Sequence, residues 1–422
     1  MNNFRDMYVF ELRKVFKRRI VLITMIIMLM ISCYMGMAEV LSIHTYTDSE
    51  SGKKVELSGY EVLQMNRANA LTIHGKLIDD GLLSEVRESY RGVYYEGDAS
   101  VDVAYGVTVR DVIEGESFSD VEARIKEQER LKKIYQYVRR ITGDYNAIHV
   151  VSAADLYKER MDYIQEEMEW QKLTEGEKMY WKAEEEKLSK PFVYGYADGW
   201  DRIIEEVYSL NVMLLLTIAI CLSTVFSEEH VRKTDQLILC SKYGKRTLYM
   251  AKILAGVTFG LSSAVVMLMA SLIPTLLIYG TEGFDVALQI YSPFAGWNIS
   301  MGQATLLMIL IYLVVAMLYS IITMFLSEAL RNSVAVMGIM FGGMLFTLVF
   351  TFYTEIRVLG QIYELLPTRI FGMWEFMDLQ LVKIFGVYFT NLQIAPILYI
   401  VCSVILIFTG KQLYKNYQVS GR

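Results

Sequence analysis

The chain has 422 residues, of which 54% are hydrophobic and 21% charged, and its formal net charge is −6. This is too apolar for an ordinary soluble protein and too charged for a chain buried entirely in a bilayer. We therefore expect an α-helical integral membrane protein with a water-exposed part, and no nucleic-acid partner.

Residues 1–19 are predicted to form an amphipathic elbow helix before the first span at 20–42. The apolar residues on one face are Phe4, Tyr8, Leu12, Val15 and Phe16, and the basic residues of interest are Arg13, Lys14 and Lys17. Two roles stay open and are compatible: an interfacial anchor, or an additional contact with a cytoplasmic partner. The apolar run is longer than a signal-peptide core, so we expect an uncleaved span.

Six apolar runs are long enough to cross a bilayer: 20–38, 207–226, 253–279, 304–326, 333–353 and 392–408. If the N-terminus lies inside, the inner segments (1–19, 227–252, 327–332 and 410–422) hold 16 basic and 6 acidic residues. The two short outer segments (280–303 and 354–391) hold 3 basic and 6 acidic residues. The positive-inside rule then predicts both termini in the cytoplasm. We expect a multi-pass protein of the cytoplasmic membrane of a bacterium.

Residues 43–206 form a predicted extracytoplasmic domain, mostly helical (α or α+β). Helical patterns occupy 119–141, 153–169 and 175–188, and a strand is expected around 101–109. The domain carries 22 basic and 34 acidic residues, a net charge of −12, while the rest of the chain carries +6. The acidic surface is either simply solvated or attracts cationic peptides or metal ions.

Residues 207–422 hold the remaining spans and two special segments. The first is a short amphipathic helix at 227–241. The second, at 362–389, is apolar but contains Pro367, Arg369, Glu375, Asp378 and Lys383. Charges at the centre of a bilayer are costly, so we interpret it as interfacial or re-entrant.

The sequence predicts no catalytic or metal site. The phosphate-binding pattern G-x-x-x-x-G-K-[ST] and the zinc pattern H-E-x-x-H are both missing from the sequence. The pair Glu228-Glu229 with Arg232 departs by one residue from the EExxxR of an intramembrane protease family, and no histidine lies well inside a predicted span. We expect no cofactor on this chain.

Two G-x-x-x-G pairs lie in predicted spans and allow close helix packing, either within one subunit or between two. They are Gly256 with Gly260 and Gly338 with Gly342.

The segment 226–252 carries a family resemblance. Phe226, Glu229, the apolar run Leu237-Ile238-Leu239, Arg246 and Lys252 are similar to the loop between spans two and three of ABC-2 type transporter permeases. The elbow helix, the six spans and the large domain after the first span also resemble that family. In the family this loop is the coupling helix that docks on the ATPase subunit, although the segment could instead only anchor the loop.

The resemblance implies the permease subunit of an ABC exporter. ATP and Mg would be bound by a separate ABC ATPase subunit, and the permease would pair with itself or with a second permease. The coupling residues implied are Glu228, Glu229, Arg232, Thr234, Leu237, Ile238, Arg246 and Lys252. The alternative is a non-transporting membrane sensor or scaffold that transmits ATPase-driven motion to extracytoplasmic partners.

Overall fold

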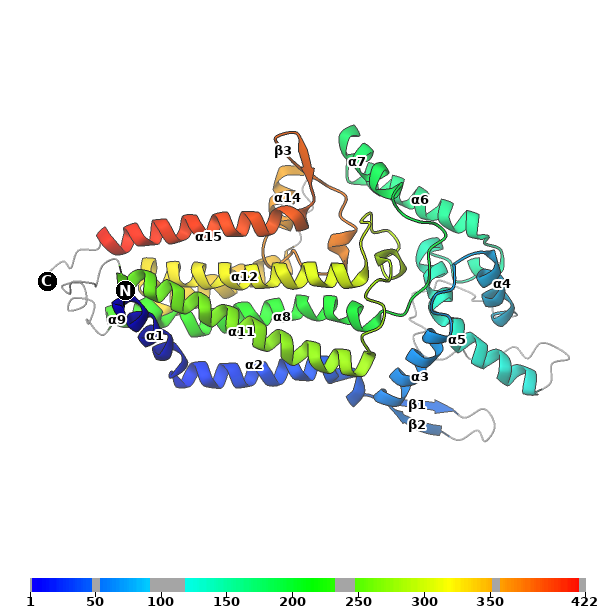
Figure 1. The fold of residues 1–422 in the computed structure, drawn as a ribbon, viewed down its shortest axis with the longest axis horizontal. Helices are drawn as coiled ribbons and strands as arrows, with labels where there is room; N and C mark the ends of the chain where they lie inside the picture. Colours follow the sequence, from blue (N-terminus) through cyan, green and yellow to red (C-terminus); the bar gives the residue numbers. More distant parts are fainter. Residues whose placement is uncertain (1, 48–53, 92–117, 232–246, 351–356, 417–422) are drawn as a thin grey trace.

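The computed structural model describes residues 2–47, 54–91, 118–231, 247–350 and 357–416. Helices dominate these residues, and they form a long bundle with a large domain at one end (Figure 1). The helix α1 (Asn2–Phe16) and the last turns of α15 (Asn391–Asn416) lie at the opposite end, which we call the α1 end.

Within the described residues, five helical segments are long and apolar enough to cross a membrane. They are α2 (Arg19–Met37) with the short helix η1 (Ala38–Leu41), α8 (Asp198–Leu222) with α9 (Thr224–Val231), α11 (Thr247–Tyr279), α12 (Met301–Leu330) and α15. The helix α13 (Ser333–Val349) is apolar but has only 17 residues. At 1.5 Å per residue it measures about 26 Å, near the lower limit for a span, so the sixth span stays a prediction.

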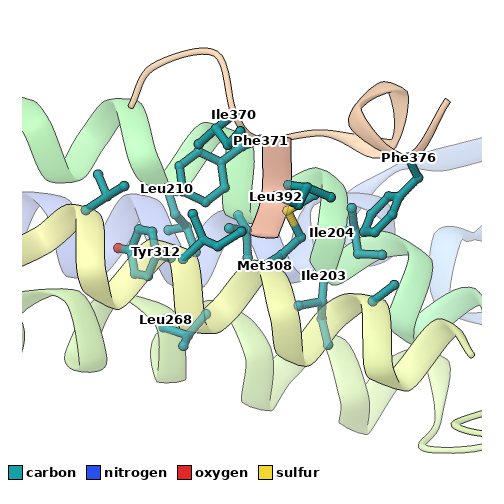
Figure 2. Packing of buried hydrophobic residues seen from close by; sticks show 14 of the residues in the cluster. Ile203, Ile204, Leu210, Leu268, Met308, Tyr312, Ile370, Phe371, Phe376 and Leu392 are labelled. Carbon is teal, nitrogen blue, oxygen red and sulfur yellow. The ribbon is translucent and has the colours of Figure 1, made fainter. Parts of the chain in front are cut away.

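The bundle is organised around α12, which packs against α8, α11 and α15, while α2 packs against α11 and α8. Tyr312 and Met308 of α12 are fully buried among residues of α8 and of the chain before α15 (Figure 2). The helices α2, α13 and α15 keep exposed apolar faces, as expected for surfaces that contact lipid.

The large domain (residues 43–197) is mainly helical in its described residues. Its elements are the antiparallel pair β1 (Ile43–Thr47) and β2 (Lys54–Ser58), α3 (Gly59–Thr72), α4 (Asp80–Ser89), α5 (Phe118–Thr142), η2 (Ala147–His149), α6 (Ala153–Trp170) and α7 (Glu175–Glu185). The helices α5, α6 and α7 lie close to the three predicted stretches. Sequence analysis missed α3, which starts with a capping box of Ser58 and Glu61, and α4, which Asp79 caps. The strand expected at 101–109 falls outside the described residues.

The segment predicted as interfacial or re-entrant lies along the bundle. It begins within the last turn of α14 (Arg357–Glu364) and contains η4 (Met373–Phe376) and the hairpin of β3 (Val382–Ile384) and β4 (Val387–Phe389). Its non-helical backbone is held by side chains from the bundle: Asn211 Nδ2 donates to the Pro367 carbonyl and the Tyr399 hydroxyl to the Leu365 carbonyl, both at 2.8 Å. Irregular backbone is tolerated beside a membrane when protein groups satisfy it in this way.

The large domain is bonded to the loops at its end of the bundle. Arg160 is fully buried and donates to the Pro293 carbonyl at 2.6 Å. Arg357, at the start of α14, pairs with Glu177 of α7. A movement of the large domain would therefore pull on the loop before α12 and on the segment before α15.

Candidate functional site

A cluster of ion pairs at the α1 end joins α1, α9 and α11. Lys14 of α1 donates to Glu229 Oε1 of α9 at 2.9 Å, and Lys252 of α11 lies 2.6 Å from the same oxygen. Glu11 lies 3.8 Å from Lys14. One carboxylate of α9 therefore holds two lysines that are 238 positions apart in the sequence.

Lys252 is the most enclosed member of this cluster, with 0% of its side chain exposed. Its ammonium also donates to the Val225 carbonyl at 3.2 Å and lies 4.9 Å from the centre of the Phe226 ring. A buried ammonium needs both a counter-ion and hydrogen bonds to offset its lost hydration. Glu229 and Val225 supply them, and Phe226 adds a cation–π contact.

A second pair ties the α1–α2 junction to α9. Arg18 Nη2 donates to Glu228 Oε2 at 2.6 Å, and Arg18 also donates to the Thr224 hydroxyl. Phe226 packs in an aromatic cluster with Tyr249 and Tyr414, with ring centroids 5.5–5.8 Å apart. Through these contacts α9 is fixed to the α1–α2 junction, to α11 and to α15.

The hydroxyl of Ser327 also bonds the start of α9 to α12. Ser327 Oγ donates to the Ser223 carbonyl at 2.6 Å and accepts from the amides of Phe226 and Ser227 at 3.2 Å each. Displacing α9 would break these bonds as well as the ion pairs. A displacement of the chain that follows α9 would therefore be transmitted through α9 to the helices of the bundle.

The structure brings together three of the predicted coupling residues, Glu228, Glu229 and Lys252, and places Lys14 of the elbow helix with them. The other predicted coupling residues, Arg232, Thr234, Leu237, Ile238 and Arg246, lie outside the described residues. Arg13 lies on the same helix as Lys14, and Lys17 directly follows the end of that helix; within the part of the chain that the structure describes, neither forms an ion pair. Spacing alone could not reveal the pairing, because the partners lie on three different helices.

The two glycine pairs differ in surroundings. A Cβ added to Gly256 or Gly260 would collide with Met324 or Ser320 of α12, so this pair packs within the subunit. A Cβ added to Gly338 or Gly342 of α13 would meet nothing within 4 Å.

The profile of the ABC-2 family transporter proteins matches residues 100–410. This chain belongs to that family. The match runs from before α5 into α15 and so includes α9, the Glu229–Lys252 pair and part of the large domain. Neither a curated protein nor a solved structure matches the chain. As an ABC-2 permease, the chain is a multi-pass membrane protein and the membrane subunit of a transporter whose family works with an ABC ATPase.

Sequence analysis of this permease missed a buried acid. The predicted second span starts at 207, but α8 starts at Asp198, so Glu206 lies within a helical segment that is long and apolar enough to cross a membrane, with 3% of its surface exposed. Ser271 and Thr275 of α11 donate to its carboxylate, Thr275 at 3.0 Å. Buried acids in spans are costly and usually functional, so Glu206 is a second candidate residue.

Proposed function

We propose that this protein is the permease subunit of an ABC exporter of the cytoplasmic membrane, powered by ATP that a separate subunit hydrolyses. The α1 end would face the cytoplasm and the large domain the outside. The observation that carries the proposal is the cluster of Lys14, Glu229 and Lys252, because it fixes the segment resembling a coupling helix to two further helices.

The cluster is suited to coupling for a physical reason. Residues 227–241 would dock on the ATPase, and a displacement there would act on α9 through the backbone. Since α9 is bonded to α1, α11 and α12, it could not move alone without exposing the buried charge of Lys252. Supporting this proposal are the family match and the basic flanks at the α1 end.

The subunit would pair with a second permease, either a copy of itself or a related chain, through α13. Gly338 and Gly342 lie on an exposed part of this helix, beside exposed Val334, Ile339 and Leu345. A G-x-x-x-G face without a close neighbour in its own subunit can accept a second helix at short distance.

Docking on the ATPase is tested with Leu237→Asp combined with Ile238→Asp. Each apolar side chain buried in a groove of the ATPase would contribute about 1.5–3 kcal/mol, and the added charges would have to be desolvated. We expect normal insertion of the double variant but loss of ATPase co-purification and of ATPase activity in lipid. The matched control is Val150→Asp with Met179→Asp, which adds the same charges at exposed sites of the large domain. If the double variant still co-purified with the ATPase and supported full ATPase activity, residues 227–241 would serve only as a membrane anchor.

A further inference from the structure

A groove with a volume of about 970 Å³ lies between α6 and α7 of the large domain. Its floor is apolar: Met161, Ile164 and Met168 of α6 face Trp181 of α7 and Leu379. The three α6 residues follow the i, i+3, i+7 spacing of one helix face, over about 10 Å of helix. Ile164 and Trp181 are packed against other residues, while the two methionines are only half-buried and so remain available to a ligand.

The rim of this groove is acidic. It has five carboxylates and three lysines: Asp162, Glu166, Glu169, Glu185 and Glu186, with Lys178, Lys182 and Lys190. Lys178 is held by Glu169 and Lys190 by Glu185, each at 2.6 Å. In contrast, no basic group of the described residues pairs with Asp162 or Glu166, which are exposed on α6. A negative rim around an apolar floor repels anionic lipid headgroups and attracts a cation with an apolar body.

The floor of the groove also includes residues from outside the large domain. Trp181 Nε1 donates to the Leu379 carbonyl at 2.7 Å, and a Cβ on Gly296 would lie 2.7 Å from the Trp181 ring. Gly296 precedes α12 and Leu379 precedes α15. An occupant would therefore contact the large domain and both segments that lead into these two spans.

We propose that this groove binds a cationic amphipathic peptide, with its apolar face on the methionines and its basic residues toward Asp162 and Glu166. A groove with apolar anchors at helical spacing fits a short helix laid along α6. Methionine side chains adapt to varied apolar partners. Binding is independent of the proposed transport function; only its expected effect on ATP hydrolysis rests on that function.

The test uses the full chain in nanodiscs of phosphatidylcholine, with empty nanodiscs as the baseline. The probe is a fluorescein-labelled twelve-residue peptide of leucine and lysine with leucines at helical spacing, followed by fluorescence anisotropy. We expect Asp162→Lys with Glu166→Lys to weaken binding about tenfold or more, because attraction becomes repulsion. The matched control, Glu56→Lys with Glu88→Lys, makes the same change in net charge on exposed residues outside the groove and should bind as the wild type does. Met168→Ser should weaken binding by about tenfold through lost apolar contact.

Equal binding by the groove variant and its control would overturn the proposal, as would equal binding of a peptide with serine in place of leucine. Calcium ions that bind in calorimetry and displace the peptide would show a cation site instead. With the ATPase subunit added, the peptide should change the rate of ATP hydrolysis in the wild type but not in the groove variant. Peptide binding without any effect on ATP hydrolysis would contradict the proposed function and leave the groove proposal standing.

Discussion

The buried ammonium of Lys252 makes the strongest stability prediction. Lys252→Met keeps most of the side-chain volume but removes the charge that lies 2.6 Å from Glu229. Glu229 would remain 7% exposed and would lose the nearer of the two lysines that pair with it in the described residues. Removing one partner of a buried pair costs about 3–5 kcal/mol. At roughly 2 °C per kcal/mol for a chain of this size, the melting midpoint should fall by about 6–10 °C.

The assay is thermal unfolding of the purified permease in nanodiscs, followed by tryptophan fluorescence. Lys415→Met is the matched control: it is the same substitution and removes one positive charge, but Lys415 is exposed at the end of α15. Glu229→Gln with Lys252→Met removes both charges and should recover part of the loss, giving a coupling energy of about 1 kcal/mol or more. If Lys252→Met behaved like Lys415→Met, or if the double variant lost the sum of the single losses, the buried pair would not hold α9 to α11.

Three further predictions concern helix packing, membrane topology and pH. Gly260→Leu should reduce the amount of folded protein, because the leucine side chain would collide with Ser320. Gly338→Leu should leave the subunit folded and weaken dimers in native mass spectrometry. Equal folding yields of the two variants would contradict the close packing of α11 on α12 at Gly260. In a variant without native cysteines, an impermeant thiol reagent should label Glu88→Cys in intact cells and Lys415→Cys only after lysis, and the reverse result would invert the topology. Burial raises the pKa of Glu177, but hydrogen bonds from Arg357, Thr174 and the Leu381 amide outweigh burial and lower the pKa overall. The stabilisation of the fold by the ionised Glu177 is therefore fully present above its ordinary pKa of about 4.5. It is lost as pH falls through the lowered pKa. The difference in melting midpoint between wild type and Glu177→Gln should therefore shrink below pH 4.5, and a constant difference would show that the Arg357 pair contributes nothing.

The sequence alone determined the class of this protein, because membrane insertion depends on the local length and hydrophobicity of each run. The helices α2, α11, α12 and α15 could be recognised for that reason, and α5, α6 and α7 from their apolar periodicity. The family could be recognised from a short motif and the order of the elements. All of these signals lie within a few neighbouring turns of the chain.

The tertiary structure decided which of these residues meet. Glu229 is joined to Lys14 and Lys252 from two other helices, and Glu206 to Ser271 and Thr275 of α11. The groove floor likewise combines α6 with Leu379 from a distant part of the chain. Periodicity shows that a helix has a buried face, but the partner of that face depends on how the helices pack, since several apolar helices offer similar surfaces. A charge in such a face is tolerated only where the packing supplies its counter-ion, and that condition is set by the folded bundle.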